Sequence, residues 1–118
     1  MDKYALGDSG EMLAQKYLTE NGYVILDTNV RYAGVGEIDI VAKDGGTLVF
    51  IEVRARSDRR YGHPLETITP AKIKKVVAAS RRYLSLKNVP ATGYRYDVVS
   101  VLYGEPQLIK NAFYARWN

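Results

Sequence analysis

Residues 36–56 read GEIDIVAKDGGTLVFIEVRAR, which is two apolar runs on either side of a glycine-rich turn. Gly45 and Gly46 tolerate the positive φ angles that tight hairpin turns require. A turn at these glycines places Asp39 opposite Glu52 on neighbouring strands, so the two carboxylates share one face. The stretch therefore predicts a β-hairpin with a pair of acidic side chains across its open end.

The apolar side chains support this register of the hairpin, whose strands we expect over 37–43 and 47–55. A shift of one residue would scatter the acidic side chains over both faces, because strand side chains alternate. Apolar residues occupy both faces, which is typical of strands covered on both sides in a layered α/β protein. The other expected cross-strand pairs are Glu37 with Arg54, Ile38 with Val53, Ile40 with Ile51, Val41 with Phe50, and Ala42 with Val49.

The open end of the hairpin gathers the carboxylates of Glu37, Asp39 and Glu52. Carboxylates inside a protein repel one another and lose hydration, so another group must compensate their charge. A divalent cation such as Mg²⁺ or Mn²⁺ would do so, since these ions prefer oxygen ligands. A salt bridge between Glu37 and Arg54 would also do so, and the spacing alone leaves both interpretations open.

The length and composition are those of a small globular protein. A chain of 118 residues is enough for one compact domain, which we expect to span residues 1–118. There is no cysteine, which excludes disulfides, thiolate metal sites and a cysteine nucleophile. No stretch near Met1 has the pattern of a signal peptide and no apolar run is long enough to span a membrane. We therefore expect a cytoplasmic protein with no membrane partner.

The remaining chain predicts helices and strands around the hairpin. The expected elements are a helix over 3–21, a strand over 23–31, the hairpin, a helix over 70–86, and strands over 94–103 and 107–114. Thr69 and Pro70 suit the N-cap and the first position of the second helix. Three consecutive strands followed by a helical crossover predict a mixed sheet with helices packed on it. The last strand is expected at an edge of that sheet.

Two charged residues lie where local structure does not explain them. Glu11 is seven residues from Leu18 and shares the inward face of the first helix, so it needs a partner. An arginine or lysine at the helix edge would serve, and so would a metal at the carboxylate cluster. Lys72 lies in the first turn of the second helix, where the macrodipole disfavours a cation. An acidic partner or a bound anion would explain its position.

Basic residues form two groups in a chain whose formal net charge is +4. This charge permits nucleic-acid binding without requiring it. Both groups could contact a phosphate backbone or simply form a solvated surface. The groups are Arg54, Arg56, Arg59 and Arg60 after the hairpin, and Lys72, Lys74, Lys75, Arg81 and Arg82 on the second helix.

His63, the only histidine, has no second histidine to complete a metal pair and is interpreted as a turn residue.

A glutamate on a first helix, an aspartate and a Glu-x-Lys on a hairpin, and a basic helix together resemble the restriction-endonuclease-like nuclease superfamily. The segments GEMLAQKYLTENGYVIL, GEIDIVAKDGGTLVFIEVRAR, YGHPLETITPAKIKKV and YRYDVV resemble one family more closely. It is the YraN-like family of small bacterial proteins, predicted relatives of Holliday-junction resolvases. The resemblance covers nearly the whole chain. It implies an α/β fold with an α-β-β-β-α-β core, a central mixed sheet flanked by helices, and here an extra C-terminal strand.

Carried over residue by residue, the resemblance implies a metal-dependent endonuclease acting on phosphodiester bonds of structured or branched DNA. Asp39 and Glu52 would bind Mg²⁺ or Mn²⁺ with the carbonyl of Val53, and Glu11 would approach the metal from the first helix. Glu37 would support the site, and the resolvase relatives are dimers, which leaves a homodimer open. The implied catalytic residues are Glu11, Asp39, Glu52, Arg54 and Lys72. Those expected to contact DNA are Arg56, Arg59, Arg60, Lys74 and Lys75.

One position departs from the superfamily pattern. The usual Glu-x-Lys is here Glu52-Val53-Arg54. Arginine can stabilise negative charge on a phosphate, but its guanidinium stays protonated and cannot act as a base. Lys72 could supply the missing amine from the second helix. A non-catalytic nucleic-acid-binding protein and a protein-interaction module with an acidic salt-bridge network are the alternative hypotheses.

Overall fold

The computed structural model describes residues 3–56 and 68–114 as two helices and five strands. These elements lie close to their expected bounds. Tyr103 and Gly104 adopt φ angles of 52° and 77° and form a two-residue turn, so the last strand begins two residues earlier than expected. The elements are α1 (Lys3–Glu20), β1 (Val24–Tyr32), β2 (Gly36–Asp44), β3 (Thr47–Arg56), α2 (Pro70–Leu86), β4 (Gly93–Leu102) and β5 (Glu105–Phe113).

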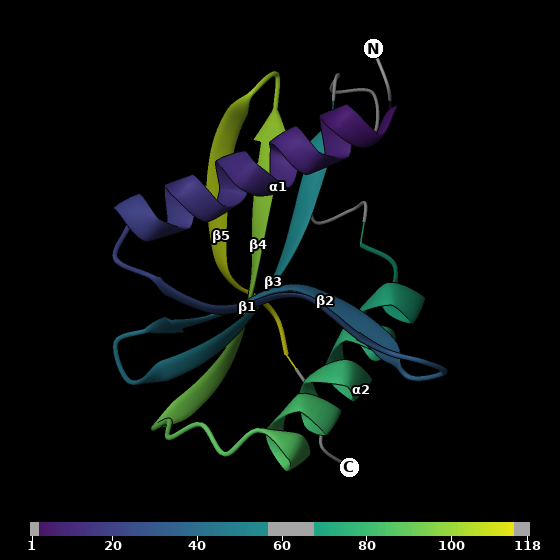
Figure 1. The fold of residues 1–118 in the computed structure, drawn as a ribbon, viewed down its shortest axis with the longest axis vertical. Coiled ribbons are helices and arrows are strands. Elements are labelled where there is room, and N and C mark those ends of the chain that lie inside the picture. The colour runs from purple at the N-terminus through teal and green to yellow at the C-terminus, as the bar shows by residue number, and fades with distance from the viewer. Residues whose placement is uncertain (1–2, 57–67, 115–118) are drawn as a thin grey trace.

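The five strands form one sheet in the order β1-β2-β3-β4-β5 (Figure 1). β3 and β4 are parallel and are connected through α2, whereas all other neighbouring strands are antiparallel. A parallel pair requires such a crossover, and a helix is its usual form. The predicted mixed sheet flanked by helices is therefore confirmed, and so is the edge position of β5.

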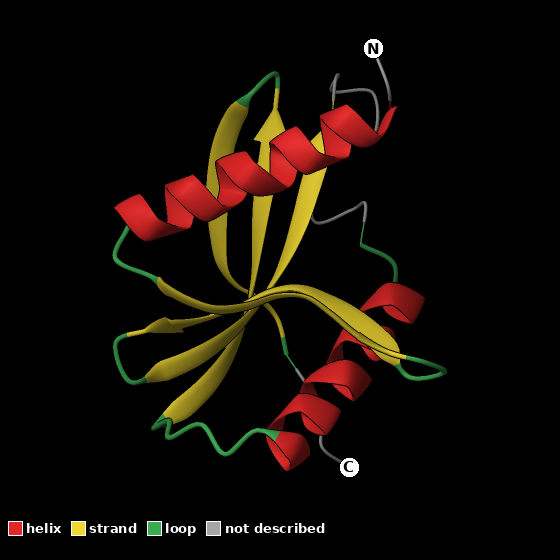
Figure 2. Ribbon diagram, viewed as in Figure 1, coloured by secondary structure: helices red, strands yellow, loops and turns green. Residues whose placement is uncertain are grey.

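The two helices cover opposite faces of the sheet, and each encloses an apolar core. α1 crosses β3, β4 and β5 (Figure 2), and its Leu18 is fully buried in a cluster with Ile51. α2 packs on β2, and its Val76 and Tyr83 are buried in a second cluster with Phe50. The rings of Tyr83 and Phe50 meet edge to face with centroids 6.0 Å apart. Burial on both sides explains why the hairpin strands are apolar on both faces.

The predicted hairpin register is confirmed from the turn as far as Ile40 and Ile51. Beyond this pair the register between β2 and β3 ends, whereas β2 stays paired with β1 as far as Gly36 and β3 stays paired with β4 to the end of the strand. Figure 2 shows β1 and β2 curving away from β3. We call this opening between β2 and β3 the fork.

The separation of the strands changes the contacts expected at the end of the hairpin. Ile38 packs in the α2-side cluster, whereas Val53 packs against the α1-side cluster. The predicted pairing of Ile38 with Val53 is therefore wrong. Glu37 and Arg54 are likewise not register partners, because the pairing of β2 with β3 ends at Ile40 and Ile51; the partner of Glu37 on β1 is Arg31.

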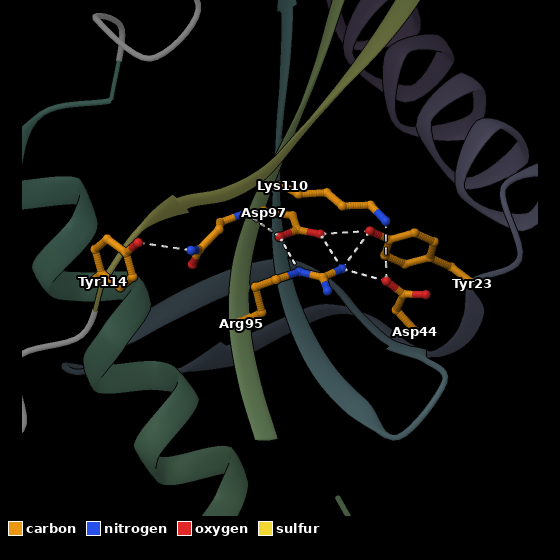
Figure 3. Close-up of polar contacts among 7 residues, drawn as sticks. Tyr23, Asp44, Arg95, Asp97, Lys110 and Tyr114 are labelled. Atoms are coloured by element: carbon orange, nitrogen blue, oxygen red, sulfur yellow. Dashed lines mark hydrogen bonds and ion pairs between the residues drawn. The ribbon is translucent and has the colours of Figure 1, made fainter. Parts of the chain in front are cut away.

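A polar network on the α1 face joins residues of β2, β4 and β5 with Tyr23, which lies in the connection between α1 and β1 (Figure 3). Asp97 is fully buried and accepts hydrogen bonds from the Tyr23 hydroxyl at 2.8 Å, from Arg95 Nε at 2.9 Å and from the Asn111 N–H at 2.9 Å. Arg95 also donates to Asp44 at 2.8 Å. An arginine partner therefore explains the position of Asp97 in an apolar strand.

Candidate functional site

Two carboxylates replace the missing backbone hydrogen bonds at the fork. Glu52 Oε2 accepts a hydrogen bond from the Asp39 N–H at 3.2 Å. Asp39 Oδ2 accepts one from the Val53 N–H at 2.9 Å. Each carboxylate is thus oriented by the backbone of the opposite strand, and the predicted juxtaposition of Asp39 with Glu52 is observed.

Glu52 is the most deeply buried acid of the fork, with 1% of its surface exposed. Burial and the charge of Asp39 raise the pKa of Glu52 to about 7, although Lys72 acts in the opposite direction. Burial also raises the pKa of Asp39, and the hydrogen bond from Val53 opposes that shift. Within the described part of the chain, Glu52 Oε1 is buried and has no hydrogen-bond partner. A buried acceptor of this kind is unusual and is suited to bind a cation.

Lys72 reaches the fork from the first turn of α2. Thr69 caps this helix, its Oγ1 accepting a hydrogen bond from the Lys72 N–H at 3.1 Å, and Pro70 occupies the first position. Lys72 Nζ lies 3.5 Å from Glu52 Oε1 and 3.7 Å from Glu37 Oε1. Acidic partners therefore explain a cation in the first turn of the helix, as one of the two sequence-based interpretations proposed.

Glu37 is held by an arginine that sequence reasoning did not identify. Arg31 on β1 places its Nη2 at 3.0 Å and its Nε at 3.1 Å from Glu37 Oε2. The contacts described for Glu37 are with Arg31 and Lys72, and they replace the salt bridge with Arg54 that the spacing had suggested. The sequence contains a signal for this contact, because a turn centred on Gly34 makes residues 31 and 37 cross-strand partners.

Arg54 lies near the carboxylate pair without belonging to the hydrogen bonds described there. It is two residues from Glu52 on β3, and its charge lowers the pKa of both Asp39 and Glu52. The side chain is half-buried, and its Nε is buried without a hydrogen-bond partner among the described residues. Arg54 thus contributes positive charge on the β3 side of the fork, whereas Lys72 contributes it from α2.

Glu11 is half-buried on α1, next to the closest approach of this helix to β3. A Cβ atom on Gly10 would lie 2.6 Å from the Ala55 Cβ, so only glycine allows this approach. Over residues 3–56 and 68–114, however, no three His, Cys, Asp or Glu side chains form a group that could hold a metal ion. The structure brings Asp39 to Glu52 but does not assemble Glu11 with them as a third ligand.

The donors at the fork fit a magnesium-type ion that keeps most of its water. Mg²⁺ is commonly held by one or two carboxylates together with water and substrate phosphate oxygens. Asp39, Glu52 and the carbonyl of Val53 would be the protein ligands, and the buried Oε1 of Glu52 would gain a partner. The bound ion would repel the ammonium group of Lys72, which lies 3.5 Å from that oxygen, and would favour its movement away from Glu52.

The predicted DNA-contacting residues are only partly described. Lys74 and Lys75 are exposed on α2, which agrees with either a phosphate contact or a solvated surface. Arg56 ends β3. Arg59, Arg60 and His63 lie outside the described residues. Neither α1 nor α2, as far as they are described, is long and apolar enough to cross a membrane.

Comparison with known proteins shows the family of the chain. The model of the uncharacterised protein family UPF0102 matches residues 10–101. A UPF0102 protein of Chlorobaculum parvum is 48% identical over 99 residues, covering 84% of this chain and 76% of the relative. Another, of Symbiobacterium thermophilum, is 43% identical over 115 residues, covering 93% of this chain and 97% of the relative. A third, of Lachnoclostridium phytofermentans, is 44% identical over 114 residues, covering 96% of each. The chain therefore belongs to family UPF0102, the YraN-like family that its motifs resemble.

Proposed function

We propose that this protein is a metal-dependent endonuclease that hydrolyses phosphodiester bonds of structured or branched DNA. The observation that carries the proposal is the fork, where Asp39 and Glu52 face each other across two separating strands and Glu52 is almost fully buried. The order α1-β1-β2-β3-α2-β4 agrees with the restriction-endonuclease-like core that the sequence resembles. The preference for branched DNA rests on the resemblance to resolvases.

The proposed mechanism assigns a separate role to each charged residue of the fork. Mg²⁺ or Mn²⁺ held by Asp39 and Glu52 would polarise a phosphate oxygen and lower the pKa of bound water. Backbone N–H groups keep the two carboxylates oriented before substrate arrives. Lys72 and Arg54 donate to the phosphate oxygens on which negative charge develops. Binding through the phosphate backbone carries little base specificity.

Mn²⁺ titration by calorimetry tests the metal site directly. We expect saturable binding to the wild type and a loss of at least about tenfold in affinity for Asp39→Asn, because the neutral amide is a poor ligand and no longer offsets the ion's charge. Asp44→Asn is the matched control, since Asp44 lies in the Arg95 network and should leave Mn²⁺ binding unchanged. Equal affinity of Asp39→Asn and the wild type would refute the metal site.

The second candidate function is a nucleic-acid-binding protein on a degenerate nuclease fold. Two observations favour it: arginine stands where the superfamily has lysine, and Lys72 already forms ion pairs with two of the three carboxylates. Such a protein would use the same basic surface to bind DNA without cleaving it.

The substitution Arg54→Lys separates the two candidates. A nuclease limited by the missing lysine should gain at least about tenfold in cleavage of a branched DNA with Mn²⁺, because lysine supplies an amine that can orient water. A binding protein should keep its affinity for the same DNA and remain inactive. Arg82→Lys on the exposed face of α2 is the matched control and should change neither quantity.

A further inference from the structure

A cavity of about 420 Å³ lies beside the fork, between the β1–β2 turn and the first turns of α2. Its charged lining consists of Arg31 from β1, Glu37 from β2, and Lys72 and Lys75 from α2. These are three cations and one carboxylate, so the lining carries a surplus of positive charge. Arg31 has 79% of its side chain exposed and Lys75 is also exposed. Both can therefore turn toward an anion without disturbing the core.

The backbone brings these cations together. A Cβ atom on Gly36 would collide with the backbone carbonyl of Lys75, so the start of β2 lies directly against α2. Gly34 adopts a φ angle of +74°, which a residue with a side chain rarely adopts, and it lies in the tight turn between β1 and β2. Arg31 from β1 and Lys72 and Lys75 from α2 therefore line the same cavity.

The cavity adjoins the carboxylate pair. A second cavity of about 290 Å³ is lined by Arg31, Glu37 and Asp39 among others, so Arg31 and Glu37 border both spaces. Lys72 likewise lines the first cavity while lying 3.5 Å from Glu52. A DNA strand with one phosphate at Asp39 and Glu52 would therefore pass directly from the fork into this basic cavity.

We propose that this cavity binds a backbone phosphate of a DNA strand, next to the phosphate at the fork, with Arg31 and Lys75 as the binding residues. The proposal rests on the proposed function of the fork. It implies that the substrate strand runs from the fork toward the β1–β2 turn and α2. The guanidinium of Arg31 would exchange Glu37 for two phosphate oxygens, which match its planar pair of donors. Lys75 would supply a second charge from α2, and Glu37 would remain paired with Lys72.

DNA binding in EDTA tests the pocket independently of the metal. The affinity of a short fluorescein-labelled duplex and of a four-way junction is measured by fluorescence anisotropy over a range of salt concentrations. Arg31→Ala and Lys75→Ala should each weaken binding about tenfold at moderate salt and reduce the slope of log affinity against log salt by about 1. Lys16→Ala on α1 removes the same charge from an exposed position and is the matched control, expected to bind like the wild type.

A third variant keeps the test valid if Arg31→Ala disturbs folding. Glu37→Gln removes the one acidic side chain among the described residues that line the cavity and releases Arg31, so it should strengthen DNA binding severalfold. Weaker binding by Glu37→Gln would overturn the proposal, and so would Arg31→Ala and Lys75→Ala proteins that bind like Lys16→Ala. A further outcome is that inorganic phosphate shifts the NMR signals of Gly34 and Lys75 while both alanine variants bind DNA like the wild type. The cavity would then bind a free anion and not a DNA phosphate, and the proposal would be overturned.

The outcomes separate this pocket from the metal site. A protein that binds Mn²⁺ at Asp39 but shows no dependence on Arg31 keeps the proposed chemistry and loses the pocket. A protein that fails the Mn²⁺ titration but loses DNA affinity in Arg31→Ala and Lys75→Ala keeps the pocket as part of a non-catalytic binding surface.

Discussion

Replacing Arg95 with methionine should reduce the free energy of unfolding by about 3–5 kcal/mol. Asp97 is fully buried and receives two of its hydrogen bonds from Arg95, at 2.9 and 3.0 Å. The variant would leave this carboxylate with only the neutral donors of Tyr23 and Asn111. An uncompensated buried charge is costly because it has lost hydration without gaining an opposite charge. Urea unfolding followed by circular dichroism measures the loss.

Two further variants test the cause of that loss. Lys110→Met removes a cation that is 57% exposed and 3.5 Å from Asp44, and it should cost no more than about 1 kcal/mol. The double variant Arg95→Met, Asp97→Asn should be more stable than Arg95→Met alone, because it removes the charge that has lost its partner. Equal unfolding free energies for Arg95→Met and Lys110→Met would show that the network does not stabilise the fold.

Replacing Glu52 with glutamine should stabilise the metal-free protein at pH 8 by about 3 kcal/mol. The pKa of Glu52 is about 7 in the folded protein against a reference value of 4.5. Between these values the folded state binds more protons than the unfolded state, so stability falls as the pH rises from 4.5 to 7. Above pH 7 the full cost of the buried charge is present, and glutamine removes it. Below about pH 4.5 the two proteins should be equally stable.

Urea unfolding in EDTA at several pH values between 4 and 8 checks this prediction. The difference between Glu52→Gln and the wild type should grow through that window and then level off. Glu37→Gln is the matched control, since Glu37 is 43% exposed and its replacement should change stability by less than about 1 kcal/mol at any pH. A Glu52→Gln protein that is less stable than the wild type at pH 8 would show that the ion pair with Lys72 outweighs the cost of burial.

The carboxylate pair could be predicted from the sequence because it follows from local rules. A glycine turn sets the pairing of a hairpin, and alternation then determines which side chains share a face. Asp39 and Glu52 are equally distant from Gly45-Gly46 and lie one residue beyond the last register pair, so the turn brings them together. Thr69 and Pro70 likewise specify the start of α2 through local capping, which is observed at the expected residue.

The fork could not be predicted in this way, because it depends on how all the strands of the sheet are arranged. Beyond Ile40 and Ile51, β2 follows β1 as far as Gly36 and β3 follows β4 as far as Arg56, and the two strands no longer pair with each other. The expected pairing of Glu37 with Arg54 assumed an isolated hairpin. In the sheet, Glu37 instead forms ion pairs with Arg31 on β1 and with Lys72 on α2.

The sequence by itself determined the order of the elements, the hairpin register near its turn and the presence of two facing carboxylates. These features depend on residue spacing and turn geometry, which act over a few residues. Only the tertiary structure decided which cations reach those carboxylates. Lys72 is far from Glu37 and Glu52 in the chain and lies close to both because Gly36 lets α2 lie directly on β2. Contacts of this kind depend on how helices pack on a sheet, which no local pattern encodes.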